Sequence, residues 1–278
     1  MSGTRAGLHR GLIELRQAYT NPVDLIGQFL TPTITLGVLF LLRNKTYGDT
    51  ELSIAELAVP GMLSTIISFN GMYALLNVLV QDREDGTLLR AKAVPKGMVG
   101  YFVGKIVTTA GAVMVQLAIV LGVSMVIIGG FSLSGPGAVA IFAWVVVLGL
   151  LAVLPFGAIL GSVLDARTGF LLTMPLMGII AISGIFYPIT AMPGWLQGLA
   201  QVFPIYWLGL GMRSALLPEE AVAIELDQSW RHLETVGVLG LWAVVGLLIA
   251  PFILRRMANH ESGSVMAQRR DKAMQRAF

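Results

Sequence analysis

The residue types that most often carry catalysis form no recognisable set in this sequence. The three histidines, His9, His232 and His260, lie outside the long apolar stretches, at separations that match no metal-binding pattern. No Ser-His-Asp set can be assigned to a common pocket. We therefore expect neither a metal site nor a catalytic site, and no cofactor bound by this chain itself.

A glycine and a lysine at Gly104-Lys105 match part of the phosphate-binding pattern G-x-x-x-x-G-K-[ST]. The rest of the pattern is missing, because Ile106 follows the lysine and Val99 stands where the first glycine is needed. The chain is therefore not expected to bind and hydrolyse ATP through a phosphate-binding loop of this type. If it drives an ATP-dependent process, the ATPase must be a separate chain.

A charged segment from Gln81 to Lys105 separates two long apolar stretches. Neither residues 57–81 nor residues 106–164 contain an Asp, Glu, Lys or Arg, so the charged segment must reach water. Its acidic residues come first and its basic residues later, an order that complements the macrodipole of a short helix. The acids are Asp82, Glu84 and Asp85, and the bases are Arg90, Lys92 and Lys96.

This short helix has start and stop signals in the sequence. Gly86-Thr87 predicts the start, with Thr87 as the N-cap, and Pro95 predicts the stop. Leu88 and Leu89 are then left exposed. A helix of this kind between membrane spans needs lipid or another protein to bury its two leucines.

The same segment resembles the signature (E/D)-R-E-x-G-T-L…P…G-K of ABC-2 type transporter permeases, with Asp82 where Glu is commoner. In that family the segment is the cytoplasmic loop whose coupling helix docks on the ATPase subunit. The resemblance implies a coupling loop at residues 81–102. It assigns ATPase coupling to Asp82, Arg83, Glu84, Gly86, Thr87, Leu88, Leu89 and Pro95.

A second block of residues, 184–213, resembles the other hallmark of the family, the region after the fifth span. Residues 168–212 carry no acidic or basic side chain, a stretch too long for one span, and Pro188, Pro193 and Pro204 fall where a second span would need an uninterrupted helix. We expect one span and then a re-entrant helical hairpin at 188–216 on the outer side, with a bend at Gly184. The residues assigned to this hairpin region are Gly184, Pro188, Pro193, Trp195, Pro204 and Arg213, the last at the outer interface.

The composition requires a membrane protein. Of the 278 residues, 55% are hydrophobic and 13% charged, whereas soluble domains carry about a quarter charged residues. The length fits one membrane domain of five to seven spans of about 20 residues, without a soluble catalytic domain. The predicted fold is all-α, with an N-terminal helix at 1–22, a transmembrane domain at 23–254 and a basic tail at 255–278. Its six spans are expected at about 25–42, 55–80, 103–128, 138–164, 168–186 and 235–254.

The N-terminal helix is predicted to be amphipathic and interfacial. Leu8, Leu12, Leu15 and Tyr19 form one helical stripe that leads into the first span. An ordinary solvated helix is the alternative. Fifteen of the nineteen lysines and arginines fall on the side of the termini and the charged segment, which places both termini in the cytoplasm of a bacterial inner membrane. The same rule explains the net charge of +3 without a nucleic-acid partner.

Two polar stripes occur within predicted spans. Gln28, Thr31 and Thr35 recur at helical spacing in the first span, and Asn70, Tyr73 and Asn77 do so in the second. Such groups face the bundle interior or a cavity, so they either line a translocation path or hydrogen-bond between helices. Gly100-x-x-x-Gly104 and Gly157-x-x-x-Gly161 predict close helix packing within one subunit or across a dimer.

The sequence thus favours the permease subunit of an ABC exporter, most similar to the branch that exports drugs and antibiotics. The resemblance implies separate ATPase subunits that carry ATP and Mg, and a second permease subunit, in the lipid bilayer. The substrate would be a drug, an antibiotic, a lipid or a glycolipid. An ion-coupled secondary transporter or channel is the alternative, disfavoured because the ionisable residues fall at predicted span ends.

Overall fold

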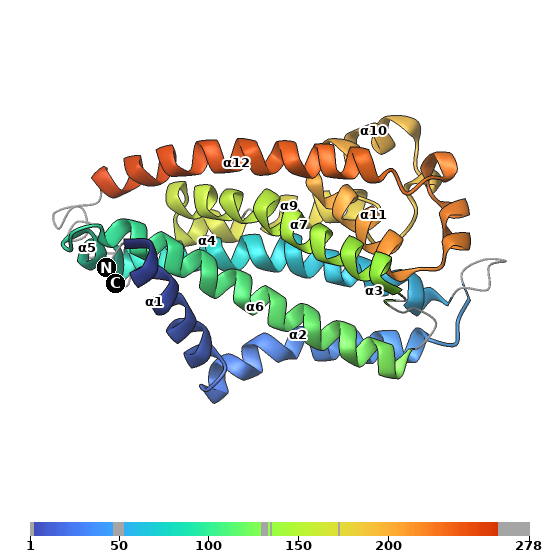
Figure 1. Ribbon diagram of the computed structural model, residues 1–278, viewed down its shortest axis with the longest axis horizontal. Helices are drawn as coiled ribbons and strands as arrows, with labels where there is room; N and C mark the ends of the chain where they lie inside the picture. Colours follow the sequence, from blue (N-terminus) through green and yellow to red (C-terminus); the bar gives the residue numbers. More distant parts are fainter. Residues whose placement is uncertain (1–2, 47–52, 129–132, 134, 172, 261–278) are drawn as a thin grey trace, which may run out of the picture.

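The computed structural model describes residues 3–46, 53–128, 133, 135–171 and 173–260, and within these residues every regular element is helical. Four helical stretches are long and apolar enough to cross a membrane: Ile54–Glu84, Gly97–Ile127, Gly135–Val163 and His232–Asn259. They correspond to four of the six predicted spans. Figure 1 shows them side by side along the long axis of the molecule.

The other two predicted spans are less regular. The first corresponds to α2 (Pro22–Leu42), whose apolar part, Gln28–Leu42, is shorter. The fifth is divided into α8 (Ala166–Leu171) and α9 (Thr173–Ile182). Since neither meets the length and composition of a full span, the count of six stays a prediction.

The remaining elements gather at the two ends of the bundle (Figure 1). One end holds α1 (Gly3–Ala18) and the short helix α5 (Thr87–Lys92), together with the C-terminal end of α12 (His232–His260). The opposite end holds α10 (Gly194–Val202), α11 (Pro204–Leu216) and three 3-10 turns, η2 (Ile189–Ala191), η3 (Glu219–Ile224) and η4 (Leu226–Gln228).

The second span is one continuous helix with an irregular middle. It begins at α3 (Ile54–Thr65), where Ser53 and Glu56 form a reciprocal capping box, and continues through a π-helical segment, η1 (Ile66–Gly71), into α4 (Met72–Glu84). Ser64 and Ser68 donate hydrogen bonds to carbonyls one turn back. Widened segments of this kind occur mostly where a helix serves a functional site.

The core lies between this helix, α7 (Gly135–Val163), α11 and α12. Nearly every residue of α11 is buried, so it packs on α3, α7 and α12 at once. Gly149 of α7 lets the side chain of Leu208 approach its backbone closely. A short helix surrounded by longer ones in this way is held by tertiary contacts rather than by its own length.

The N-terminal helix packs along the start of α6 (Gly97–Ile127) through glycines. A Cβ atom added to Gly7 would lie 2.5 Å from the carbonyl oxygen of Gly100, and one added to Gly11 would lie 2.7 Å from that of Gly104. The close packing predicted for Gly100 and Gly104 is confirmed, and it occurs within one chain. The leucine stripe is divided: Leu8 and Leu12 are exposed, whereas Leu15 packs against Gly111 of α6.

Candidate functional site

The charged segment forms a short helix, α5, between α4 and α6. Thr87 is its first helical residue and not its N-cap as expected; Gly86 occupies that position with a left-handed backbone (φ 77°) that favours glycine. The N–H of Thr87 donates instead to the Asp85 carboxylate at 2.8 Å. Burial opposes ionisation of Asp85, but the hydrogen bonds from Thr87, together with the charges of Arg90 and Lys105, lower the pKa of this carboxyl.

The predicted exposure of Leu88 is wrong. Its side chain is only 2% exposed and packs with Leu75, Leu79 and Tyr101, so it belongs to the core of this chain. Leu89 is half-buried. The reason is that α5 lies directly on α4 and α6, which draws the face with Leu88 and Ala91 inward. Exposed on its outer side are Arg90, Lys92, Val94, Pro95 and Lys96.

Asp82 is buried at the end of α4 and connects three helices. The Tyr101 hydroxyl donates to its Oδ2 at 2.7 Å, and the Lys105 ammonium lies 3.0 Å from the same oxygen. Lys105 also lies 3.2 Å from Glu14 of α1, whose other oxygen is 2.7 Å from Nε of Arg10. Asp82, Lys105 and Glu14 therefore tie α4, α6 and α1 together directly behind α5.

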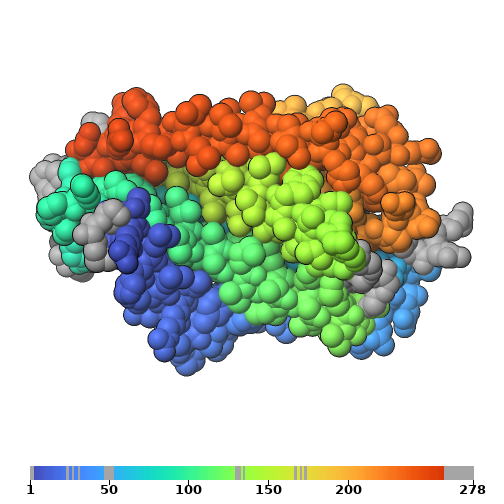
Figure 2. Space-filling view, viewed as in Figure 1, coloured from blue at the N-terminus to red at the C-terminus, as the bar shows by residue number. Residues whose placement is uncertain are grey.

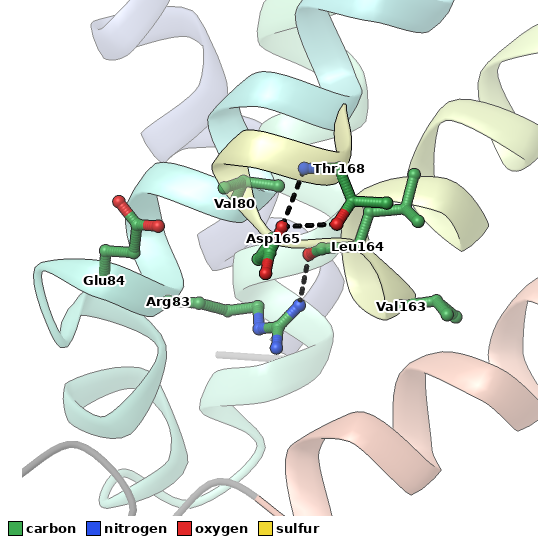
Figure 3. A pocket seen from close by; sticks show the side chains of 7 residues that line it. All are labelled: Val80, Arg83, Glu84, Val163, Leu164, Asp165 and Thr168. Atoms are coloured by element: carbon green, nitrogen blue, oxygen red, sulfur yellow. Dashed lines mark hydrogen bonds between the residues drawn. The ribbon is translucent and has the colours of Figure 1, made fainter. Parts of the chain in front are cut away.

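Arg83 binds the C-terminal end of α7. One guanidinium nitrogen donates to the carbonyl oxygens of Gly161, Ser162 and Leu164 at 3.0 to 3.3 Å, which satisfies acceptors that a helix end leaves open. Figure 3 shows this side chain beside a pocket of about 340 Å³, which the next residue, Glu84, also lines. Asp165 and Thr168, also in this view, form the cap of α8.

A groove of about 520 Å³ separates α1 from α5. Its walls carry three basic side chains, Arg10 from α1 and Arg90 and Lys96 from the α5 segment, and Tyr101 contributes from α6. The predicted coupling residues thus divide. Asp82, Arg83 and Leu88 hold the chain's own helices together, whereas Thr87 and Pro95 line this groove. Arg90, Val94 and Lys96, which the prediction did not include, line it as well.

The two polar stripes are joined through a third helix. The amide of Asn70 in η1 donates to the side chain of Gln116 in α6 at 3.4 Å, and Gln116 donates to the backbone carbonyl of Gln28 in α2 at 3.2 Å. Asn77 donates to the carbonyl of Tyr73 within its own helix. Thr35 is half-buried, and the side chain of Thr31 lies outside the described residues.

At the opposite end, the three prolines begin helical elements, as their interruption of the apolar run predicts. Pro188 and Pro193 precede η2 and α10, and Pro204 is the first residue of α11. Gly184 has a left-handed backbone (φ 64°), which fits the predicted bend. Trp195 is exposed. Both short helices lie at one end of the bundle (Figure 1).

The expectation that Arg213 lies at the interface with water is wrong. Its side chain is 2% exposed and forms a two-point ion pair with Glu225, with Nε 2.6 Å from Oε1 and the second contact at 3.3 Å. Its remaining nitrogen donates to the carbonyls of Gly184 and Ile185 at 3.0 and 3.3 Å. Burial is tolerated because Glu225 and these carbonyls neutralise and bind the guanidinium.

Comparison with known proteins decides the family. Residues 22–252, most of the chain, match the family model described as "ABC-2 family transporter protein". The chain belongs to the ABC-2 transporter family. Its resemblance to the family signature is thereby confirmed, and with its long apolar helices it is a multi-pass membrane protein.

This ABC-2 chain is 28% identical over 201 residues to a protein named "Probable multidrug ABC transporter permease YbhR" from Escherichia coli K12. The protein of the same name from Escherichia coli O157:H7 matches to the same extent. The alignment covers 70% of this chain and 53% of the relative, so the chain spans about half the length of these relatives.

Several functional candidates of this ABC-2 protein were not identified from sequence. Glu14 and Glu225 had no recognisable partner in the sequence, because Lys105 and Arg213 reach them only in the fold. Gln116 could have been found as an isolated amide in an apolar helix of 31 residues. The glycines of α1, spaced four apart, carried the same packing signal as Gly100 and Gly104.

Proposed function

We propose that this protein is the membrane-spanning subunit of an ABC exporter, which moves an amphipathic drug, antibiotic, lipid or glycolipid outward. The energy comes from ATP and Mg bound to separate ATPase subunits. Membership of the ABC-2 family supports the class, and the word "multidrug" in the name of the E. coli relatives supports an amphipathic substrate. The protein itself acts by binding and moving substrate and hydrolyses nothing.

The observation that carries this proposal is the basic groove between α1 and α5. It lies at one end of the bundle, beside the start of α6, and is bordered by Arg90, Lys96 and the 59%-exposed Val94. An apolar centre with flanking charges is typical of a surface that binds another protein. The ATPase subunit docks on this surface, with acidic residues facing the bases, and not on Leu88.

The ion pairs next to α5 explain how docking of the ATPase subunit could move the membrane-spanning helices. Asp82 ends the second span, Lys105 lies in α6, and Glu14 belongs to α1, so a displacement of α5 acts on three helices. Asp82 and Glu14 therefore serve coupling as positioning residues within this chain. They do not contact the ATPase subunit.

The substrate path is proposed along the half-buried polar groups of α2 and the second span, namely Gln28, Thr35, Asn70, Tyr73 and Asn77, with Gln116 added from the structure. The π-helical segment η1 directs Asn70 toward Gln116, which supports this assignment. A second permease copy completes the path. Apolar side chains of α2, such as Ile26, Leu30 and Ile34, are exposed at helical spacing and offer it a surface.

Both termini and α5 are placed in the cytoplasm of a bacterial inner membrane, and the hairpin of α10 and α11 is placed on the outer side. The excess of Lys and Arg at the α5 end supports this orientation. Cysteines introduced at the exposed positions Ala191 and Glu219 should both react with an impermeant reagent added outside cells. Labelling of either position from the cytoplasm alone would contradict the hairpin.

An ion-coupled transporter would need ionisable groups in mid-membrane. In the described part of the chain, the ion pairs lie near the two ends of the bundle, around Lys105 at the start of α6 and around Arg213 and Arg231 at the opposite end. This distribution disfavours ion coupling.

Co-purification of the ATPase subunit with the permease tests the proposal. Val94→Asp together with Arg90→Glu should abolish co-purification while membrane insertion is unchanged. Lys45→Glu makes a matched charge reversal at an exposed residue of the opposite end and should leave co-purification unchanged. Wild-type recovery of the ATPase subunit with the Val94 and Arg90 double variant would refute docking on this surface.

A further inference from the structure

A second groove, of about 500 Å³, lies between α6 and α12 and shares no residue with the polar groups of the proposed path. Pro155 and Ala158 of α7 contribute to it between the two walls. It lies at the end of the bundle where α6 begins and α12 ends, and both helices lie on the face shown in Figure 2. The groove is therefore accessible from the side of the bundle.

The groove has the length of one leaflet's hydrocarbon layer. The part of its α12 wall from Leu247 to Arg255 spans eight residue steps and advances about 12 Å at 1.5 Å per residue, and the lining continues to Asn259. The α6 wall from Met98 to Ile106 has the same length. Half of a bilayer's hydrocarbon core is about 15 Å thick. A ligand lying along the groove would thus extend through most of one leaflet.

The walls are apolar along this length and basic at one end. Phe102 and Ile106 face the groove from α6, and Leu247, Pro251 and Leu254 face it from α12. The apolar run of α12 then ends at Arg255, which lines the mouth of the groove together with Asn259. Chain direction places the start of α6, the positive end of its macrodipole, at this same end.

The guanidinium of Arg255 is available to a ligand. Its side chain is exposed, and within the described residues no carboxylate forms an ion pair with it. Arginine presents a planar fork of donors that matches a phosphate group. A neutral apolar ligand would leave this charge unused, and a hydrophobic cation would be repelled by it.

We propose that the groove between α6 and α12 binds an anionic glycerophospholipid from the leaflet at the α5 end of the bundle. One acyl chain lies along the apolar walls, and the phosphate group binds Arg255 with Asn259 beside it. The site is separate from the substrate path and would hold α12 against α6, two helices that share few direct contacts.

Native mass spectrometry of the full-length protein in detergent tests this site by titration with phosphatidylglycerol and phosphatidylcholine. Phosphatidylglycerol should bind more tightly to the wild type, and Arg255→Gln should weaken that binding about tenfold, equivalent to ~1.4 kcal/mol. Arg256→Gln is the matched control, because Arg256 is an adjacent exposed arginine that does not line the groove. Ala158→Leu, which fills the groove, should lower binding of both lipids.

Three results would overturn the proposal. The first is equal affinity of the wild type for the two lipids, and the second is an equal effect of Arg255→Gln and Arg256→Gln. The third is displacement of the bound lipid by a hydrophobic cationic dye that binds the wild type and Arg255→Gln with equal affinity. That result would assign the groove to a transport substrate. If Ala158→Leu does not fold, the comparison of the two arginine variants still decides the question.

Discussion

The ion pair of Arg213 and Glu225 makes a sharp prediction about stability. Arg213→Met removes the guanidinium from a site where Glu225 is 3% exposed, so a carboxylate is left buried without its partner. Removing one member of a buried pair costs about 3–5 kcal/mol. The carbonyls of Gly184 and Ile185 lose their donor as well, which places the loss toward the upper end.

The double variant Arg213→Met with Glu225→Leu should recover most of this loss. Replacing both members of a buried ion pair by apolar side chains of similar volume is often neutral or stabilising. Because the two residues contact each other, their effects should not add, and the cycle of two single variants and the double variant measures the coupling. We expect a coupling free energy of at least about 2 kcal/mol.

The assay is thermal unfolding of the purified protein in detergent, followed by intrinsic fluorescence and by recovery on size exclusion. At about 2–4 °C per kcal/mol for a chain of this size, Arg213→Met should lower Tm by roughly 6–20 °C. Arg213→Lys keeps the charge but not the two-point contact and should fall between wild type and Arg213→Met. The reasoning is refuted if the loss of stability of the double variant, relative to wild type, equals the sum of the losses of the two single variants.

Three further predictions concern the end of the bundle at α5. Leu88→Asp should destabilise or unfold the protein itself, because burying a leucine side chain contributes roughly 1.5–3 kcal/mol to the free energy of unfolding. Val94→Asp, at an exposed position, should leave Tm unchanged. Equal Tm values for the two variants would contradict the burial of Leu88. Gly7→Leu should detach α1 from α6 and lower Tm, because no room exists beside Gly100, while Leu12→Ala on the exposed face should have no effect on Tm. Burial opposes ionisation of Glu14, but Arg10 and Lys105 lower the pKa of this carboxyl below its usual 4.5. A carboxyl whose pKa is lowered in the folded state stabilises the fold at pH values above its unfolded pKa. This contribution is lost as the pH falls through the folded-state pKa. A spin label at position 9, in place of His9, should therefore become mobile below about pH 4.5 in the wild-type background. In Glu14→Gln, where Asp82 is the remaining acid beside Lys105, the change in label mobility at that pH should be smaller. An identical change in both proteins would exclude Glu14 as its cause.

Features that depend on local composition could be predicted from the order of residues. Uninterrupted apolar stretches such as 106–127 and 136–163 can only be helices in a membrane, because every backbone N–H and C=O must be satisfied within the segment. Pro193 and Pro204 predicted where α10 and α11 begin, since proline suits the start of a helix and not its interior. The charged segment and its resemblance to the ABC-2 signature identified the family from the order of residues alone.

Which faces are buried and which distant residues meet depends on how the helices pack. Leu88 looked exposed because its neighbours in sequence are polar, but α5 lies on α4 and α6, and that contact has no local signal. Arg213 was assigned to water because an isolated buried charge is costly, and the sequence gives no sign that Glu225 and two carbonyls converge on it. Helical periodicity shows that a helix has two faces, whereas the neighbour on each face is set by how the whole chain packs.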